Sequence, residues 1–237
     1  MKKSVQFLLL FLMCISASWT WASDAPERTV LFNMGDYDSQ YWRIPALVTA
    51  ADNSLVAVVD KRGSSLGDLP NTISIMSRRS TDNGKNWSEP VVVAQGGNGK
   101  TYGDPAVVLD KKTGNLICMF VGDQGLWNAT PYNRQGIYVS KSTDNGVSWS
   151  EPVAITDQVY ANHSGWYAGF AGSGHGLCLK DGRLMFVLAI RATSATGVPL
   201  HNYAIYSDDG GDNWTLSTNA ATTVGDEAKV VELEDGD

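Results

Sequence analysis

One phrase, Ser-x-Asp-x-Gly-x-x-Trp, occurs three times in this chain of 237 residues. It occupies residues 80–87, 142–149 and 207–214, so that its copies are a little over 60 residues apart. A period of that size predicts a repeated supersecondary unit that buries its faces only against neighbouring copies of itself. The fold is therefore expected to be a repeat architecture.

The content of the phrase predicts a tight hairpin turn. A short acidic side chain can accept hydrogen bonds from backbone N–H groups across a turn, and glycine permits a positive φ. The tryptophan is expected to pack its ring under the following strand. We therefore interpret Asp82, Asp144 and Asp209 as structural residues on the outer rim of the fold, far from a central site.

The rest of the chain reads as almost uniformly β-structure. Short runs rich in β-branched and aromatic residues alternate with clusters of Gly, Asn and Asp. A four-stranded antiparallel sheet repeated every 60 residues or so is the blade of a β-propeller. The predicted strands are residues 54–59, 73–77, 106–109, 116–121, 136–140, 183–190 and 203–207.

The number of repeats is too small for a closed ring. Propellers close with about four to eight blades, whereas three turn phrases account for roughly three and a half. We therefore expect residues 23–237 to be the N-terminal part of a larger propeller domain, since no linker divides them.

The first 22 residues have the pattern of a signal peptide. Lys2 and Lys3 precede an apolar run at residues 7–15, and Thr20-Trp21-Ala22 offers a cleavage site. The run is too short for a stable membrane span. The protein is expected to be exported to the periplasm, the cell surface or the medium.

Charge and cysteine usage exclude some classes of function. The formal net charge of −7 argues against nucleic-acid binding. Cys118 and Cys178 lie in apolar runs, where buried free thiols are expected rather than a disulfide. His163, His175 and His201 lack metal-ligand spacing relative to carboxylates, so neither a metal nor another cofactor is expected.

The segment Arg43-Ile44-Pro45, taken with the three aspartate-box phrases, resembles the exo-sialidases (neuraminidases). Further segments, at residues 60–62, 67–70, 103–106, 172–176 and 226–233, are similar to segments of that family in the same order. The resemblance covers residues 29–237. It implies an all-β, six-bladed β-propeller that hydrolyses terminal sialic acids from glycoproteins, glycolipids and oligosaccharides.

The resemblance also implies roles for five residues. Arg43 would be one of three arginines that bind the substrate carboxylate, and Asp68 would be the acid/base. Glu227 would activate the nucleophile, whereas Arg62 and Asp104 would contact sugar hydroxyls or the amide. The two other arginines and a tyrosine nucleophile would lie beyond residue 237, so this stretch alone is expected to be inactive.

These roles are chemically consistent. A planar guanidinium binds a carboxylate through paired hydrogen bonds. A carboxylate nucleophile would be repelled by the substrate's own carboxylate, and sialidases use a tyrosine in its place. A neutral phenol needs an adjacent base, which a glutamate provides. Hydrolysis through a covalent sialyl-tyrosine would retain the anomeric configuration.

Simpler interpretations remain for several residues. Asp68 could be a solvated loop residue. Glu227 competes with Glu232, which alternates with Val231 and Leu233 and is expected on the solvent face of a strand.

Three other residues have less distinctive surroundings. His175, between glycines, is expected in a tight turn. Trp127 and Tyr132 lie in a long loop that could line a pocket for an N-acyl group.

Two alternatives to the hydrolase stay open. A trans-sialidase would pass the same intermediate to an acceptor sugar. A non-catalytic sialic-acid-binding propeller would need Arg43 but neither Asp68 nor Glu227, and the presence of both favours an enzyme.

Overall fold

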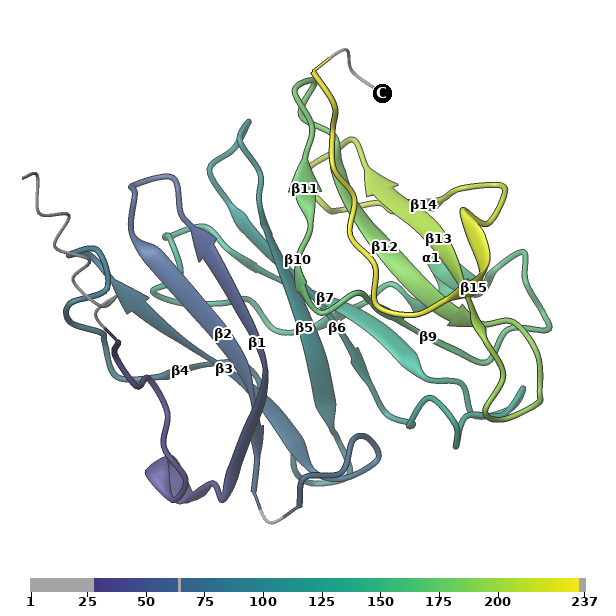
Figure 1. The fold of residues 1–237 in the computed structure, drawn as a ribbon, viewed down its shortest axis with the longest axis horizontal. Helices are drawn as coiled ribbons and strands as arrows, with labels where there is room; N and C mark the ends of the chain where they lie inside the picture. The colour runs from purple at the N-terminus through teal and green to yellow at the C-terminus, as the bar shows by residue number, and fades with distance from the viewer. Residues whose placement is uncertain (1–27, 64, 235–237) are drawn as a thin grey trace, which may run out of the picture.

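The computed structural model describes residues 28–63 and 65–234, and the predicted signal peptide lies outside them. Three antiparallel sheets stand side by side like the blades of a propeller (Figure 1). After a short 3-10 helix, η1 (Asp36–Asp38), the first blade has the strand order β1-β2-β3-β4. Its strands are β1 (Tyr41–Thr49), β2 (Leu55–Arg62), β3 (Ile73–Ser80) and β4 (Val91–Ala94).

The second blade repeats this order. Its strands are β5 (Tyr102–Leu109), β6 (Leu116–Gly122), β7 (Gly136–Ser142) and β8 (Val153–Ala154). A short strand from later in the chain, β10 (Gly174–His175), pairs in parallel with the free edge of β5. The expectation that His175 sits in a tight turn is therefore wrong, because its backbone extends the second blade.

The third blade has a divided first strand and a divided last strand. Both β9 (Ala168–Ala171) and β11 (Leu177–Cys178) pair with β12 (Leu184–Arg191). On the other side, β13 (Leu200–Ser207) pairs with β14 (Thr215–Leu216) and with β15 (Thr222–Gly225). The helix α1 (Thr156–Tyr160), which precedes this blade, was not predicted from the sequence.

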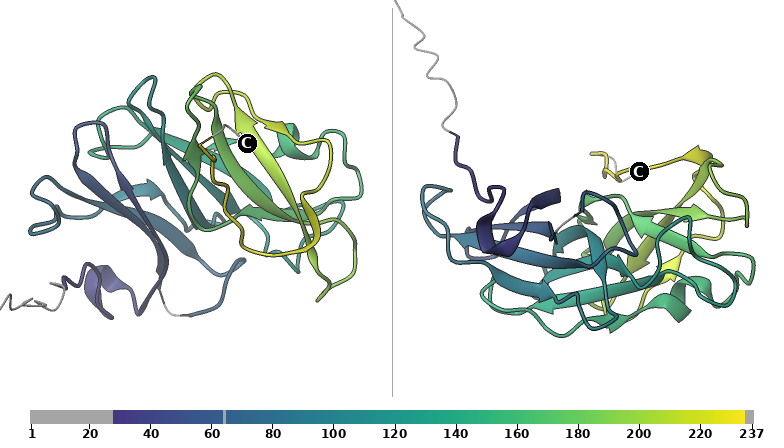
Figure 2. Two further views of the ribbon diagram at one scale, coloured as in Figure 1. Left: turned by 45° about the horizontal axis from the view of Figure 1, so that its top comes forward. Right: turned by 90° about the horizontal axis from the view of Figure 1, so that it is seen from below.

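All seven predicted strands are present, and most are longer than predicted. Figure 2 shows the three sheets from two further directions, with the C-terminal segment crossing the edge of the third blade. The sequence-based prediction of an all-β propeller, present as an open part of the ring, is confirmed.

The core lies between the blades rather than within one sheet. Val58, Ile75 and Phe120 belong to a cluster between the first and second blades, and Met119 and Phe186 to one between the second and third. Each fully buried side chain of this size contributes about 1.5–3 kcal/mol. Cys118 and Cys178 are free and buried, as predicted.

The three aspartate boxes form the turns between the third and fourth strands of the blades. In each, a carboxylate oxygen of the aspartate accepts the backbone N–H of the residue four positions on, at 2.8, 2.9 and 2.9 Å. The indole N–H of Trp149 donates to Ser77 Oγ in the preceding blade (2.9 Å). Because none of the aspartates lines the pocket described below, the structural interpretation is supported.

Replacing Asp144 with alanine should therefore reduce stability. Its carboxylate accepts the backbone N–H of Ser148 and hydroxyl hydrogen bonds from Ser142 and Ser148, which would lose their acceptor. We expect about 1–3 kcal/mol lower free energy of unfolding by urea denaturation. Val147→Ala, which trims an exposed side chain in the same turn, is the control. An unchanged free energy of unfolding in Asp144→Ala would contradict the structural role.

Candidate active site

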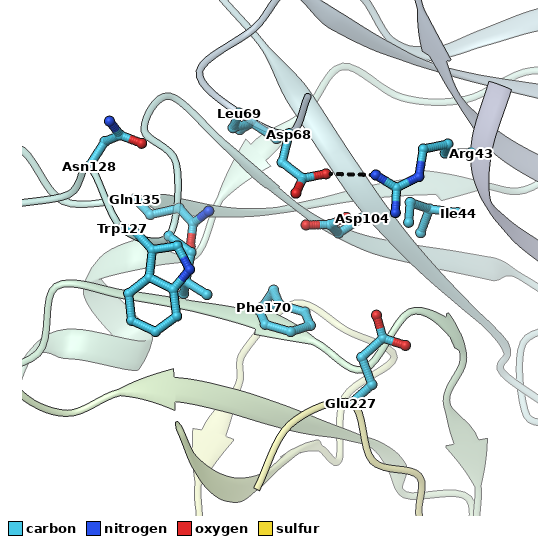
Figure 3. Close-up of a pocket in the computed structure, with 11 residues that line it drawn as sticks. Arg43, Ile44, Asp68, Leu69, Asp104, Trp127, Asn128, Gln135, Phe170 and Glu227 are labelled. Atoms are coloured by element: carbon cyan, nitrogen blue, oxygen red, sulfur yellow. Dashed lines mark hydrogen bonds and ion pairs between the residues drawn. The ribbon is translucent and has the colours of Figure 1, made fainter. Parts of the chain in front are cut away.

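A pocket of about 290 Å³ opens where the first strands of the three blades approach one another (Figure 3). Four of the five predicted site residues line it, although they are up to 184 positions apart in the chain. Charged side chains gather on one side of the pocket, and Trp127 lies on the other. The lining residues are Arg43, Ile44, Asp68, Leu69, Asp104, Leu126, Trp127, Asn128, Gln135, Phe170 and Glu227.

In successive blades, a β-bulge next to a proline brings Arg43 and Asp104 to the pocket. The register of β1 shifts after Arg43, and that of β5 shifts after Gly103. At each shift a residue with positive φ precedes a proline: Ile44 has φ 55° and Asp104 has φ 57°. Proline cannot donate to a strand ladder, and a bulge redirects neighbouring side chains. The Arg-Ile-Pro and Gly-Asp-Pro segments are therefore equivalent bulges facing the pocket.

Positive φ is costly for a β-branched residue, so Ile44 marks a strained position. Strain of this kind persists where the surrounding structure imposes it, often at a functional site. The sequence showed the Arg-Ile-Pro motif but gave no sign of the strained backbone that makes it useful.

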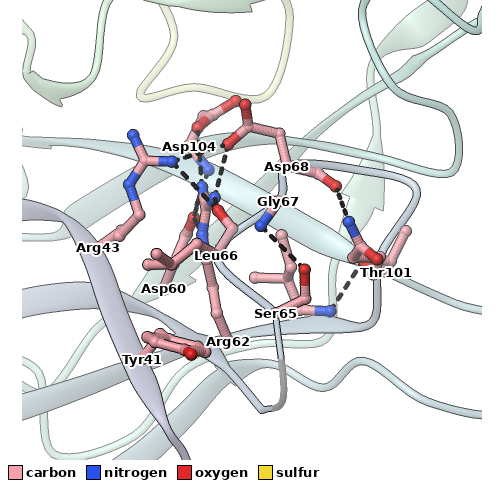
Figure 4. Close-up of polar contacts among 12 residues, drawn as sticks. Tyr41, Arg43, Asp60, Arg62, Ser65, Leu66, Gly67, Asp68, Thr101 and Asp104 are labelled. Atoms are coloured by element: carbon pink, nitrogen blue, oxygen red, sulfur yellow. Dashed lines mark hydrogen bonds and ion pairs between the residues drawn. The ribbon is translucent and has the colours of Figure 1, made fainter. Parts of the chain in front are cut away.

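Arg62 lies beneath the pocket rather than on its surface (Figure 4). Its side chain is fully buried and donates to Asp60 Oδ2 from Nη2 (2.8 Å) and Nε (3.2 Å). Its Nη1 donates to Asp68 Oδ1 (2.6 Å) and to the carbonyl of Leu66 (2.8 Å). The structure thus gives Arg62 the role of holding Asp68, and its predicted contact with substrate stays a prediction.

Asp68 projects into the pocket from a well-anchored loop. The backbone N–H and the side-chain amide of Asn71 both donate to its carbonyl, at 3.1 and 2.8 Å. Its side chain is 68% exposed, and Oδ1 also accepts a hydrogen bond from Arg43 Nη1 (3.3 Å). Two guanidinium groups therefore orient one oxygen of the Asp68 carboxylate, which remains open to the pocket. A loop residue that merely faces solvent would not need such contacts.

Asp104 lies deeper, between the two arginines and the other carboxylates. Its backbone N–H donates to Asp60 Oδ1 (3.2 Å), and its own Oδ1 is 3.9 Å from Arg62 Nη2. Burial raises the pKa of Asp104 to about 6, and the negative charges of Asp68 and Glu227 add to the rise against the opposing effect of Arg62.

This raised pKa predicts how stability varies with pH. The pKa of an unfolded aspartate is about 3.9, so the folded state binds the proton more tightly and ionised Asp104 destabilises the fold. The cost is fully present above about pH 6 and disappears as pH falls below about 4. Asp104→Asn should therefore raise the free energy of unfolding by up to about 3 kcal/mol at pH 8. Urea denaturation between pH 4 and 8 checks this, and a difference independent of pH would contradict it.

Glu227 belongs to an irregular segment that follows β15. Its neighbours fix it from both sides: Asn202 Nδ2 donates to the carbonyl of Asp226 (3.0 Å), and Lys229 donates to the carbonyl of Ser173. A Cβ atom on Gly172 would lie 2.3 Å from the carbonyl oxygen of Ala228. Glycine is therefore required at position 172 because the Glu227 segment passes directly over it.

Glu232 does not lie on a strand, so that expectation is wrong. It is held instead at the far end of the segment, where its carboxylate accepts the backbone N–H of Lys180 (3.0 Å). Of the two candidate glutamates, only Glu227 lines the pocket.

The uncharged side of the pocket was largely missed by sequence reasoning. Trp127 lines it as suggested, whereas Tyr132 is fully exposed and outside it. Gln135 and Phe170 were not predicted, because neither belongs to a recognised motif: Gln135 directly precedes β7, and Phe170 lies within the short strand β9. Gln135 is buried, and its Oε1 accepts the backbone N–H of Gly169 (3.1 Å), which directs its Nε2 away from that contact.

Residues 28–63 and 65–234 contain no group of His, Cys, Asp and Glu side chains that could hold a metal ion. Within the same ranges, the structure has no helix with the length and apolarity needed to span a membrane.

Comparison with known proteins gives the family. The family model described as a BNR repeat-like domain matches residues 44–237. The chain belongs to the BNR repeat-like family. Its boxes at Asp82, Asp144 and Asp209 are the repeats that this family name denotes, and they coincide with the three blades.

Similar BNR proteins include bacterial sialidases. The chain is 35% identical to a sialidase of Bacteroides fragilis over 85% of its length and 36% identical to one of Micromonospora viridifaciens over 82%. It spans 39% and 31% of the lengths of those two relatives.

Solved structures of sialidases share the fold. A Hadza microbial sialidase superposes with a TM-score of 0.75 at 30% identity, over 85% of this chain and 42% of that one. Trypanosoma rangeli sialidase in complex with sialic acid superposes with a TM-score of 0.67 at 20% identity, over 83% of this chain and 33% of that one. The described blades are thus part of a sialidase-type β-propeller.

Proposed function

We propose that this chain supplies half of the active site of an exo-α-sialidase, which removes terminal sialic acids from glycoproteins, glycolipids and oligosaccharides. One observation carries the proposal: Arg43, Asp68, Asp104 and Glu227, from separate segments of the three blades, line a single pocket. The sialidase relatives support it. The remaining residues of the site would belong to blades beyond residue 237, and "the complete propeller" below means this chain joined to them.

Arg43 is suited to bind the substrate carboxylate. Its side chain is 43% exposed, and only its Nη1 is engaged, by Asp68 and by the carbonyl of Leu66 (both 3.3 Å). The rest of the guanidinium faces the pocket (Figure 3). A planar guanidinium with free donors binds a carboxylate in a paired geometry that a lysine cannot reproduce.

The balance of charge supports the need for further arginines. Four carboxylates, of Asp60, Asp68, Asp104 and Glu227, surround the site, against the guanidinium groups of Arg43 and Arg62. By formal charge, an anionic sugar would meet an excess of negative groups from this chain, which the raised pKa values of Asp60 and Asp104 reduce. Two more arginines, which the sialidase resemblance places beyond residue 237, would compensate it.

Asp68 and Glu227 would carry the two proton transfers. Asp68, carrying a proton, would give it to the departing glycosidic oxygen while the tyrosine oxygen attacks the anomeric carbon and passes its own proton to Glu227. The carbon–oxygen bond to the leaving group breaks as the sialyl-tyrosine bond forms. Asp68 would then take a proton from water, whose oxygen attacks the anomeric carbon. The bond to the tyrosine oxygen breaks as Glu227 returns its proton to that oxygen, and the configuration is retained.

Arg43→Lys tests the proposal in the complete propeller. We expect the transition state to lose about 2–3 kcal/mol of stabilisation, measured as a fall in kcat/KM for an aryl sialoside. The reason is that one ammonium group replaces a planar guanidinium with paired donors. Arg183→Lys, at an exposed arginine paired with Asp208, is the control and should leave kcat/KM unchanged. Unchanged turnover by Arg43→Lys would contradict the assignment.

Product analysis separates the hydrolase from its alternatives. Intramolecular trans-sialidases from leech and from Ruminococcus gnavus share this fold, with TM-scores of 0.76 and 0.75 at 18% identity. A hydrolase should release free sialic acid as its α-anomer even when lactose is present. A sialylated lactose product would indicate transfer to an acceptor sugar, and a 2,7-anhydro product, the compound bound in the leech enzyme, would indicate intramolecular transfer. Binding without turnover would indicate a lectin.

The sequence also supports export as part of this proposal. The basic start, the apolar run at residues 7–15 and the cleavage pattern at residues 20–22 are those of a signal peptide. An exported enzyme would meet glycoconjugates outside the cytoplasm.

A further inference from the structure

Arg191, at the end of β12, is a buried cation without a carboxylate partner among the described residues. It is 2% exposed, and no ion pair of the described part of the chain includes it. Burying an unpaired charge is expensive unless hydrogen bonds and polarisable groups compensate it. Such a residue is expected to perform a task that a smaller or uncharged residue could not.

The compensation comes from the loop that carries Trp127. Arg191 Nη1 donates to the carbonyl of Leu126 (2.7 Å), and Nη2 donates to the carbonyl of Ala129 (2.6 Å). The guanidinium also lies near the rings of Trp127 and Tyr167, at 5.9 and 5.2 Å from their centroids. One side chain of the third blade therefore holds both ends of the loop 126–129 of the second blade.

The same loop also contacts the first blade next to the predicted acid. A Cβ atom on Gly125 would lie 2.1 Å from the carbonyl oxygen of Leu69, the residue after Asp68. The N–H groups of Asn128 and Ala129 both donate to the carbonyl of Gly125 (3.0 Å each), which makes the loop compact. Displacing this loop would remove Trp127 from the uncharged side of the pocket.

We propose that Arg191 is a positioning residue, which fixes Trp127 in the pocket wall by holding the carbonyls of Leu126 and Ala129 and thereby sets substrate affinity. The proposal rests on the sialidase function proposed above. It concerns the wall opposite the charged groups, so Arg191 acts on binding rather than on proton transfer. A guanidinium suits the task because two diverging N–H groups reach two carbonyls at once.

Kinetics of the complete propeller on an aryl sialoside test this assignment. Arg191→Met keeps much of the volume and removes both hydrogen bonds, and we expect KM to rise about tenfold while kcat changes less than about threefold. Arg191→Lys, which can reach one carbonyl, should show a smaller rise. Arg183→Met is the matched control, because Arg183 also stacks on a ring, that of Tyr206 (4.3 Å), but away from the pocket. It should leave KM unchanged.

A double-mutant cycle shows whether Arg191 acts through Trp127. Trp127→Ala alone should also raise KM about tenfold, and adding Arg191→Met to it should have little further effect. If the two changes multiply instead, or if Arg191→Met leaves KM unchanged, the positioning role is wrong.

Hydrogen exchange separates this proposal from the proposed function. The amides of Asn128 and Ala129 should exchange at least about tenfold faster in Arg191→Met than in the wild type. Arg191→Lys should also show faster exchange, and it replaces the methionine variant in this measurement if that variant does not fold. An absence of turnover by the wild type would overturn the sialidase proposal. Unchanged protection of these two amides in the Arg191 variants would overturn the positioning role, whatever the turnover.

Discussion

Replacing Asp68 with asparagine in the complete propeller should lower kcat/KM for natural sialosides by about 10²–10⁴-fold. The natural leaving group is a sugar alcohol, which needs a proton as the glycosidic bond breaks. An aryl leaving group departs as a stabilised phenolate, so the same variant should hydrolyse aryl sialosides with a much smaller loss. The measurement is kcat/KM of Asp68→Asn and of the wild type for both substrate classes at one pH.

The structure makes asparagine a well-matched replacement at position 68. The backbone of the loop is fixed by Asn71 through the carbonyl of Asp68, which the substitution leaves in place. The amide oxygen can still accept hydrogen bonds from Arg43 and Arg62. An equal loss on both substrate classes would indicate damage to binding and would remove Asp68 from the acid role.

Replacing Asp60 with asparagine should give the largest loss of stability among the charged residues of the site. Asp60 and Arg62 both have fully buried side chains and are joined at 2.8 Å. Burial raises the pKa of Asp60, so its ionised form depends on Arg62 for compensation. Asp60→Asn leaves the buried Arg62 with Asp68, whose side chain is exposed, as its close ion-pair partner. Removing one member of a buried ion pair costs up to about 3–5 kcal/mol. Urea denaturation of Asp60→Asn measures the change.

Two comparisons identify the cause of that loss. Asp212→Asn breaks an ion pair with Lys141 in which the aspartate side chain is 72% exposed, and it should cost less than about 1 kcal/mol. Replacing both members, with Asp60→Leu and Arg62→Met, should be less destabilising than Asp60→Asn alone, because the buried charge of Arg62 is removed together with its partner. A double variant less stable than the single one would show that the pair itself stabilises the fold.

Arg62 shows where site prediction from sequence succeeds only in part. The structure brings Arg62 into the site region, but its depth depends on Asp60. The resemblance included Asp60 in the segment 60–62 and gave it no role. The pairing of β1 with β2 places Asp60 opposite Arg43. Only this register brings the two arginines to the same carboxylate of Asp68.

The sequence by itself determined the repeat, the strands and the turns. These are local properties: Asp144 accepts hydrogen bonds from residues at most four positions away, and strand runs are specified by alternating and β-branched side chains. The charged members of the pocket were also recognisable, because motifs such as Arg43-Ile44-Pro45 are contiguous in the chain.

Only the tertiary structure decided which residues share the pocket and how each is held. Gln135 and Phe170 carry no sequence signal, since their importance comes from the approach of β7 to β9. Arg191 looks like the polar end of an apolar strand until the loop of Trp127 is seen against it. The reason is physical: burial, charge compensation and backbone approach between blades depend on contacts between residues far apart in the chain, such as Arg191 and Leu126, which no local pattern of side chains specifies.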